Sequence, residues 1–178
     1  MLLGIGYMGD DMINIFKTTT RITQLYGAHK NWKRYQRTKG HEGIDLSVGN
    51  PSRDSWDIII PGGFYNGQII QDGSYLGKTY GYSIKIWFPA NGIIMQFCHL
   101  SESSVKLGQT VGHGDIIGIM GNTGDSLAAH VHLNTIPVDE NGDYRSIYLD
   151  RGKYQDPSLV INETGFWTKK ENLEEYYG

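Results

Sequence analysis

The chain has 178 residues, 39% of them hydrophobic, which matches the size of one ordinary domain and is enough to bury a core. The formal net charge is -3 and no basic block stands out, so we expect no nucleic-acid partner. A single cysteine, Cys98, excludes an intrachain disulfide, and no apolar run approaches a transmembrane span, so we expect no membrane insertion. The apolar N-terminal stretch lacks a basic region and is interrupted by Asp10 and Asp11, which argues against a signal peptide.

Short alternating segments separated by turn residues follow one another from residue 21 onward. The 24 glycines and 12 tyrosines, with few helix-favouring runs, favour β structure. Strands are predicted, in chain order, at 21–27, 44–48, 56–63, 67–73, 82–88, 92–100 and 130–138, with tight hairpins over 103–124 and a turn at 139–146. This pattern is typical of an all-β antiparallel sandwich or barrel, and we expect one such domain with few short helices.

The segment "HVH" places two histidines two residues apart in a predicted strand. Because side chains at i and i+2 lie on one face of a strand, His130 and His132 are predicted to project together. Two imidazoles on one face can share a metal or divide the chemistry around it. Without other ligands, they are better explained as a polar pair on a solvated face.

The segment "HEGID" resembles a damaged His-Glu-x-x-His helix, in which the glutamate would be a general base. Glycines on both sides of Glu42 weaken a helix by roughly 1 kcal/mol each, and "IDLSV" alternates like a strand. In a turn that leads into a strand, His41 and Asp45 can converge on one point, and Glu42 need not take part. The alternative is an exposed loop carboxylate beside an ordinary histidine.

The segment "FCHLS" ends an apolar run, where alternation predicts that Phe97 and His99 share a face and that Cys98 points away. Cys98 is then interpreted as a packing residue rather than a nucleophile or a metal ligand. His29 lies in a polar loop and His113 in a glycine-rich hairpin, and neither is assigned a role.

The segment "DENGDY" partly resembles a calcium-binding loop. Asp139, Asn141 and Asp143 match its opening and Asp150 falls at the twelfth place, but the sixth place needs glycine and holds Tyr144. The Asn-Gly pair explains the segment as a hairpin turn, which we favour.

Taken in order, these pieces resemble one known family. The chain contains "GHEGIDLSV", "FCHLS", "VKLGQTVGHGDIIGIMGNTG" and "AHVHL", preceded by "RITQLYG" and followed by "DPSLVI". This ordered set is similar to the lysostaphin-type zinc endopeptidases of bacterial cell walls, the LytM-domain family, over residues 21 to 161. The resemblance implies a two-sheet antiparallel β fold with a metal-containing groove, whose substrate is a peptide of peptidoglycan, either in the stem or in the cross-bridge.

The resemblance also implies roles for five residues. The zinc ligands, for one ion, fall on His41, Asp45 and His132, and the two catalytic histidines on His99 and His130. Two imidazoles and one carboxylate suit zinc and leave an open position for water. We expect His130 to be the general base and His99 the stabiliser of the oxyanion, although the roles can be exchanged or shared.

Several positions depart from the family pattern. Asn134 replaces a common glutamate, Ala129 a common proline and Cys98 a usually small residue, and the region after residue 48 is longer. These departures bear on substrate preference and on tuning of the ligands more than on activity. Aromatic residues expected to wall the groove are Tyr26, Tyr80, Tyr82 and Trp32.

The expected organisation is an N-terminal arm or leader at 1–20, an endopeptidase domain at 21–161 and a C-terminal tail at 162–178. Such an enzyme acts at the bacterial cell wall, outside the cell, in the periplasm or from a virion, and without a signal peptide it resembles a phage-type or virion-associated lysin. One alternative is a non-catalytic LytM-like module that binds walls or activates an amidase. Another is a structural zinc protein, with a fourth ligand from Asn134 or the N-terminal arm.

Overall fold

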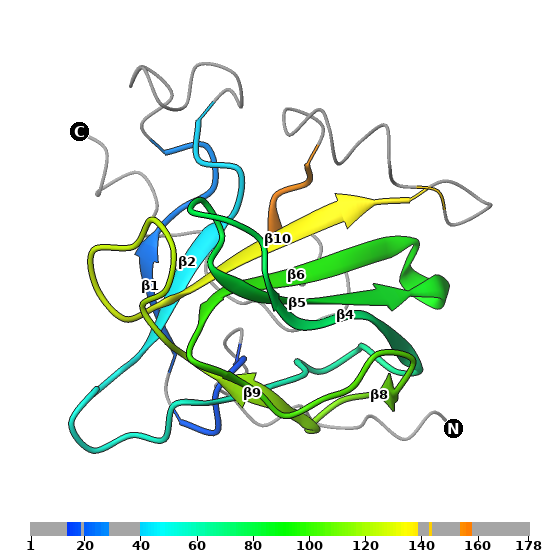
Figure 1. Cartoon of the computed structure of the whole chain (residues 1–178), viewed down its shortest axis with the longest axis horizontal. Helices are drawn as coiled ribbons and strands as arrows, with labels where there is room; N and C mark the ends of the chain where they lie inside the picture. The colour runs from blue at the N-terminus through cyan, green and yellow to red at the C-terminus, as the bar shows by residue number, and fades with distance from the viewer. Residues whose placement is uncertain (1–13, 19, 29–39, 139–142, 144–153, 158–178) are drawn as a thin grey trace, which may run out of the picture.

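Two antiparallel β-sheets make up the structure, a computed structural model that describes residues 14–18, 20–28, 40–138, 143 and 154–157. The larger sheet has seven strands in the order β1-β2-β10-β6-β5-β4-β8, and the smaller has three in the order β3-β9-β7 (Figure 1). A 3-10 helix, η2 (Pro89–Asn91), links two strands of the larger sheet. The predicted two-sheet all-β fold is therefore confirmed. The strands are β1 (Thr20–Gln24), β2 (Ile44–Val48), β3 (Asp57–Ile59), β4 (Gly67–Tyr75), β5 (Tyr82–Phe88), β6 (Ile93–Leu100), β7 (Glu102–Ser103), β8 (Thr110–Val111), β9 (Ile116–Ile119) and β10 (Val131–Pro137).

The hydrophobic core lies between the two sheets. Ile58 of β3 and Ile117 of β9 are fully buried in the same cluster as Leu46 of β2 and Leu133 of β10. Because side chains alternate along a strand, the other face of β2 and β10 is left for polar residues. That face carries the predicted metal ligands.

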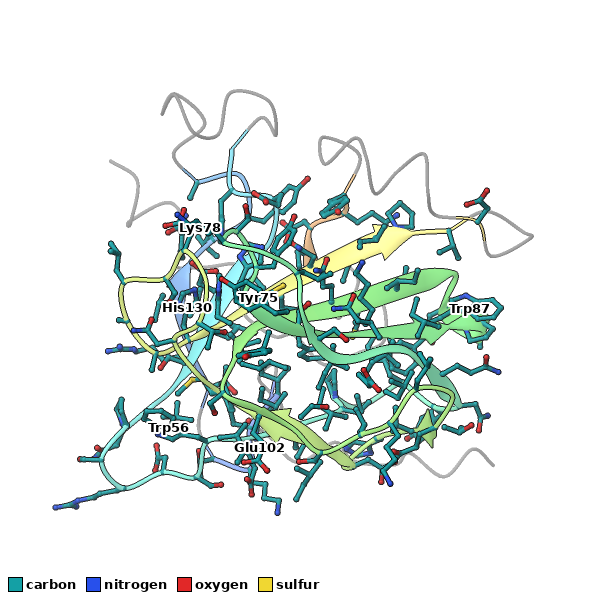
Figure 2. All side chains as sticks on the ribbon, viewed as in Figure 1. Trp56, Tyr75, Lys78, Trp87, Glu102 and His130 are labelled. Carbon is teal, nitrogen blue, oxygen red and sulfur yellow. The ribbon has the colours of Figure 1, made fainter. Side chains whose placement is uncertain are left out.

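The pairing of β10 brings distant parts of the chain together. This strand lies between β2 and β6, with His132 directly opposite Asp45 on one side and Cys98 on the other. Directly opposite residues share a face of the sheet, so the segments around residues 45, 98 and 132 meet in one row. Figure 2 shows His130 at one end of this sheet and Trp87 at the other.

Residues near both ends of the described chain pack onto the sheets. Ile15 and Phe16 are fully buried in the main core, and Phe16 bridges to Ile58. Tyr154 forms a second, smaller cluster with Ile94 and Ile136. The expected domain limits at 21 and 161 stay a prediction. Among the described residues, no helix is long and apolar enough to cross a membrane.

Candidate metal centre and active site

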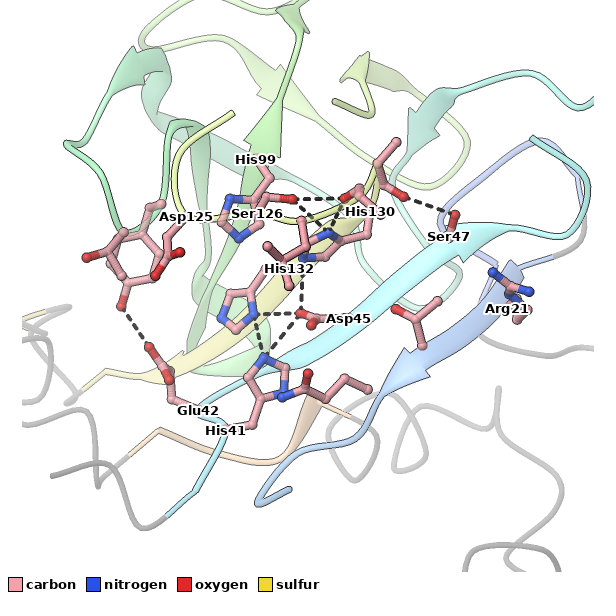
Figure 3. A pocket seen from close by; sticks show the side chains of 17 residues that line it. Arg21, His41, Glu42, Asp45, Ser47, His99, Asp125, Ser126, His130 and His132 are labelled. Carbon is pink, nitrogen blue, oxygen red and sulfur yellow. Dashed lines mark hydrogen bonds and ion pairs between the residues drawn. The ribbon is translucent and has the colours of Figure 1, made fainter. Parts of the chain in front are cut away.

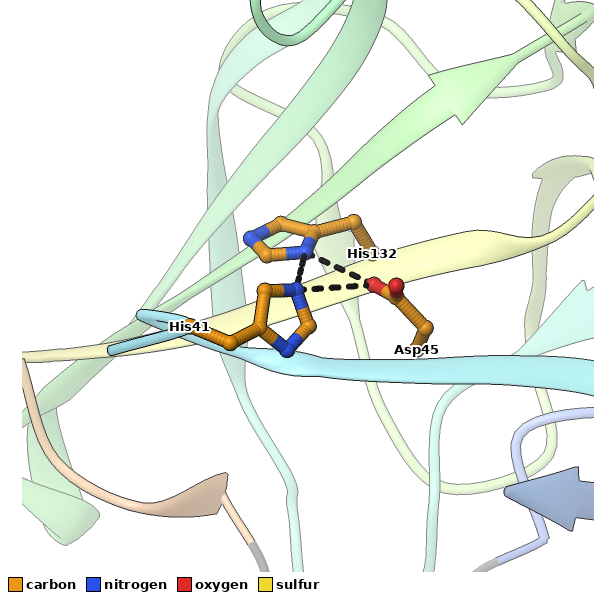
Figure 4. Close-up of side chains that lie close together, drawn as sticks. All are labelled: His41, Asp45 and His132. Carbon is orange, nitrogen blue, oxygen red and sulfur yellow. Dashed lines mark hydrogen bonds and ion pairs between the residues drawn. The ribbon is translucent and has the colours of Figure 1, made fainter. Parts of the chain in front are cut away.

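Three side chains that the sequence predicts as metal ligands meet on the polar face of the large sheet. His41 precedes β2, Asp45 lies within it, and His132 lies opposite Asp45 on β10. We call these three residues the ligand group. His41 Nε2 lies 2.9 Å from His132 Nδ1 and 3.2 Å from Asp45 Oδ1, and His132 Nδ1 lies 2.8 Å from Asp45 Oδ1 (Figure 4). Among the described residues, this is the group of side chains that could hold a metal ion.

Hydrogen bonds behind the two imidazoles fix which ring nitrogen faces the group. His41 Nδ1 lies 3.0 Å from the carbonyl oxygen of Leu25, and His132 Nε2 lies 2.8 Å from Asn134 Oδ1. Both oxygens only accept hydrogen bonds, so these ring nitrogens must carry the proton. His41 Nε2 and His132 Nδ1 are then unprotonated in the neutral rings, and they point their lone pairs at each other and at a carboxylate.

The donor set fits a divalent cation such as zinc. Three electron-rich atoms within 2.8 to 3.2 Å of one another repel unless a cation or protons lie between them. Tetrahedral zinc with bonds of about 2.0–2.2 Å holds its ligand atoms about 3.4 Å apart, close to the spacing here. Two imidazoles and one carboxylate leave one position open, as in catalytic zinc sites.

Without a metal, the electrostatics of the ligand group favour a proton on His132. Burial alone would raise the pKa of Asp45, but hydrogen bonds from His132 and His41 and their charges outweigh it and hold that pKa well below its ordinary value. Burial alone would lower the pKa of His132, but the hydrogen bond and the charge of Asp45 outweigh it and raise that pKa. The protein thus favours a carboxylate–imidazolium pair where the cation would lie.

The remaining two predicted histidines, His99 and His130, form a pair beside the ligand group, and we call them the imidazole pair. Their ring centroids are 4.7 Å apart, and His99 lies 5.9 Å from the ring of His132. His130 Nε2 lies 3.6 Å from Asp45 Oδ1 (Figure 3). The structure therefore brings all five predicted site residues together.

Backbone carbonyls orient both rings of the imidazole pair. His99 Nδ1 donates to the carbonyl oxygen of Thr123 at 2.7 Å, and His130 Nδ1 donates to that of Ala128 at 2.8 Å and also contacts Ser126 Oγ at 3.1 Å. With the proton on Nδ1, Nε2 of each neutral ring is a proton acceptor. Burial, together with the nearby His132, lowers the pKa of His99 to about 4, so its ring is neutral at physiological pH.

The predicted orientation of His99 is wrong in one respect. Alternation placed His99 on the face of Phe97, but Phe97 and Leu100 both lie in the core, and His99 points to the other side. The backbone of His99 has φ 65°, in the left-handed region that few non-glycine residues adopt. This single residue breaks the alternation at the end of β6 and turns its ring toward the ligand group.

Hydrogen bonds and close packing of the Thr123 side chain support the backbone conformation at the end of β6. The sequence did not single out Thr123. Thr123 Oγ1 donates to the carbonyl oxygen of Leu100 at 2.8 Å and accepts from the backbone N–H of Tyr82 at 3.1 Å. Gly81, at φ 61°, packs so closely on Thr123 that a Cβ there would collide with it. The only sequence signal was the glycine-rich run "GNTG".

A groove of about 300 Å³ opens over the five site residues. Its remaining walls come from β1, the segment at 79–80 and the loop at 125–129. Tyr80 lines it as predicted, whereas Tyr26 and Tyr82 do not belong to the described lining and Trp32 lies outside the described residues. Glu42, the general base of the rejected helix motif, lines the groove and accepts a hydrogen bond from Tyr80 at 3.4 Å.

The other candidates take no part in the metal centre. Cys98 is fully buried opposite His132 and is not a member of the described metal group. His113 is exposed between β8 and β9. Asn134 contacts the side of the His132 ring that faces away from the ligand group, which rules it out as a fourth ligand and makes it a support of that ring. Of the segment that resembles a calcium-binding loop, only Asp143 is a described residue, and His29 lies outside the described residues.

Fold and site together define the class of protein: a two-sheet β protein with a two-histidine, one-carboxylate metal centre of the kind that metallopeptidases use. Residues 39–146 match Peptidase family M23, and the chain belongs to that family. Membership implies a metal ion in the site.

Named relatives support membership of this family. The chain is 36% identical over 138 residues to glycyl-glycine endopeptidase ALE-1 of Staphylococcus capitis, covering 73% of this chain and 35% of that protein. It is 32% identical over 106 residues to DD-carboxypeptidase/endopeptidase Mpg of Neisseria meningitidis serogroup B, covering 56% of this chain and 21% of that one. The chain thus spans about a third or less of these relatives.

Solved structures agree on the fold. The antimicrobial peptidase lysostaphin from Staphylococcus simulans superimposes with a TM-score of 0.61 at 22% identity, over 85% of this chain and 52% of that one. This likeness confirms the lysostaphin-type fold that the sequence resemblance implied.

Proposed function

We propose that the protein is a zinc-dependent endopeptidase that hydrolyses peptide bonds of bacterial peptidoglycan, in the stem peptide or the cross-bridge. The observation that carries the proposal is the convergence of three possible ligand atoms within 2.8 to 3.2 Å of one another, beside the rings of His99 and His130. The names of the two relatives, an endopeptidase for glycyl-glycine bonds and a carboxypeptidase/endopeptidase, support the substrate class.

His41 Nε2, Asp45 Oδ1 and His132 Nδ1 would hold the zinc ion. When bound, zinc supplies a Lewis acid that activates a water molecule and polarises the carbonyl of a peptide bond. Leu25 and Asn134 keep the two imidazoles in the tautomers that such binding needs. Asp45 contributes the negative charge that partly offsets the charge of the cation.

The imidazole pair moves the proton. Attack of water on the carbonyl carbon releases a proton, which Nε2 of a neutral histidine accepts, and the same nitrogen then donates it to the leaving nitrogen as the C–N bond breaks. The products are a carboxylic acid and an amine. We assign the base to His130, whose Nε2 lies 3.6 Å from Asp45.

The role expected for His99 changes with its tautomer. A neutral His99 that donates from Nδ1 to Thr123 has no proton on Nε2, so it cannot donate to an oxyanion. Only a protonated His99 could do so, and its lowered pKa opposes that state. We therefore propose that His99 shares the base role with His130 and becomes a donor only after it has accepted a proton.

The rival interpretation is a non-catalytic module that binds cell walls or activates a partner. Loss of ligand residues would favour it, whereas all five predicted site residues are present and lie close together. The relatives named above are bacterial proteins, and the expectation of a phage-type or virion-associated lysin stays a prediction.

The test compares the protein with His132→Ala and with His113→Ala, a matched change of an exposed histidine outside the groove. Zinc content is measured together with the loss of turbidity of purified cell walls. We expect the native protein and H113A to hold one zinc ion and to clear walls, and H132A to do neither. Wall clearance by H132A, or a native protein that binds walls without metal and without clearing them, contradicts the proposal.

A further inference from the structure

Charged side chains line the groove on opposite sides of the ligand group. Glu42 and Asp125 line it on one side, and Arg21 of β1 lines it on the other (Figure 3). The groove is therefore polarised, with its basic end at the edge of the seven-stranded sheet. A bound peptide would lie between these ends, because the metal centre is between them.

The pairing of β1 with β2 sets the distance from Arg21 to the metal centre. Arg21 lies directly opposite Ser47, two residues after Asp45, and so it occupies the same face of the sheet as the ligand group. Two residues along a strand span about 6.7 Å and neighbouring strands lie about 4.8 Å apart, so the two Cα atoms are roughly 8 Å apart. An extended peptide advances about 3.3–3.6 Å per residue, which places Arg21 about two residues from the scissile bond.

Arg21 is available to a ligand. It is exposed, and no carboxylate of a described residue forms a salt bridge with it. Among the described residues that line the groove, it is the one lysine or arginine. Its guanidinium presents planar, paired donors that match the two oxygens of a carboxylate.

We propose that Arg21 binds a carboxylate of the substrate about two residues from the scissile bond, so that the preferred substrate is an acidic peptide. This inference rests on the proposed function and narrows it. Stem peptides of peptidoglycan carry free carboxylates, whereas a glycine cross-bridge has none between its ends. Arg21 therefore favours the stem peptide over a glycine bridge, the bond type in the name of the relative ALE-1.

A purely structural role for Arg21 gives a different expectation. The strand β1 is the edge of the seven-stranded sheet, and charged residues on edge strands prevent pairing with other chains. That role depends on the protein alone, so it would not change with the charge of the substrate. Substrate pairs that differ only in charge separate the two explanations.

The experiment uses a defined cross-linked stem-peptide dimer with free carboxylates and the same dimer with those groups converted to carboxamides. The native protein should cleave the acidic dimer with a kcat/KM about two- to fivefold higher, the size expected for a solvent-exposed ion pair. Arg21→Gln should remove this preference by slowing only the acidic dimer, and Arg21→Glu should reverse it. Arg53→Gln, the same change on an exposed loop outside the groove, should keep it.

Two sets of results overturn the inference and distinguish its failure from that of the proposed function. If R21Q keeps its zinc but lowers kcat/KM equally for both dimers, or leaves the ratio of the two kcat/KM values unchanged, Arg21 does not bind the substrate carboxylate. If the native protein cleaves pentaglycine and the amidated dimer as fast as the acidic one, the endopeptidase stands and the acidic preference fails. If it cleaves none of the three, the proposed function fails and this inference fails with it.

Discussion

The ligand group and the imidazole pair meet at one place but are held there by different kinds of structure. Asp45 and His132 lie opposite each other on two regular strands, so strand pairing alone brings them together. His99 lies at a left-handed backbone position and His130 at an isolated bridge just before β10, and backbone carbonyls of the 123–128 loop orient both rings. The difference implies that metal binding and proton transfer have separate supports, and that mutations can separate them.

The largest effect is expected where the ligand group loses its charge. Asp45→Ala removes the carboxylate that is hydrogen-bonded to both ligand histidines, so we expect loss of zinc and of wall hydrolysis. Activity should fall by about a thousandfold or more, because a Lewis acid contributes several kcal/mol to the barrier. Zinc content and turbidity loss measure the two results on one sample.

Glu42→Gln is the matched control for that change. Glu42 lies three residues earlier, lines the same groove and binds Tyr80, but it is not a member of the ligand group. E42Q should keep its zinc and most of its activity. A loss of zinc in E42Q equal to that in D45A would show that the groove, rather than the ligand group, determines metal binding.

Changes in the imidazole pair should impair proton transfer without removing the metal. His99→Ala and His130→Ala leave all three ligands in place, so both variants should keep one zinc ion. Their kcat should fall by about 10²–10⁴-fold, the usual contribution of a general acid or base. Steady-state kinetics on a soluble peptide, with metal analysis beside it, tests this separation. If both variants lose their zinc, the two groups are one unit.

The same contrast decides how much of the site could be read from the sequence. Alternation predicts that His130 and His132 share one face of a strand, and the family resemblance assigns His132 and Asp45 to the metal. His99 was assigned to the wrong face because one positive φ reverses the alternation, and side-chain pattern does not encode that angle. The order of strands was not predicted either, although only the neighbourhood of β2 and β10 makes the site.

The sequence could not show which backbone carbonyl groups orient the side chains of the site. Every residue has a carbonyl group, so nothing in the identity of Thr123 or Ala128 shows that its oxygen orients the ring of His99 or His130. Asn134 stood out as a departure from the family pattern and as a possible fourth ligand, and its hydrogen bond to His132 explains why a polar residue is present. Arg21 had no signal, because its place in the groove follows from the pairing of β1 with β2.

A smaller effect is expected behind the ligand group, at Asn134. Asn134→Leu removes the acceptor that holds His132 Nε2–H, so zinc affinity should fall by about 10- to 100-fold. Gly43 packs tightly there, since a Cβ on it would lie 2.5 Å from Asn134 Oδ1 and 2.8 Å from His132 Cε1. Competition with a chromogenic chelator measures the affinity without recourse to activity.

Gln96→Leu is the control for the change at Asn134. Gln96 is fully buried directly opposite Asn134, and neither polar atom of its side chain has a hydrogen-bond partner among the described residues. Replacing an unpaired buried amide with an apolar side chain costs little stability. Q96L should therefore keep the native zinc affinity, and an equal loss in both variants would show a general effect of the polar face.

The smallest expected effect is on the stability of the metal-free protein as pH changes. The pKa of Asp45 is lowered by folding, so its contribution to stability is present above about pH 4 and is lost as pH falls. The pKa of His132 is raised by Asp45 and, more weakly, by Glu42, so its contribution is full below about pH 6.5 and is lost as pH rises. Both contributions are full between about pH 4 and 6.5, where the metal-free protein should have its highest Tm.

Zinc should oppose the higher stability at acid pH, because it binds only the deprotonated imidazole and competes with the proton on His132. Thermal melts with a chelator and with excess zinc, at pH 5.5 and pH 8, test both halves of the argument. The increase in Tm on adding zinc should be larger at pH 8, while the chelated protein should melt at a higher temperature at pH 5.5. In Asp45→Asn the chelated protein should lose its preference for acid pH, since no carboxylate remains to stabilise the imidazolium. A chelated native protein with equal Tm at both pH values would mean that no proton replaces the cation in the ligand group.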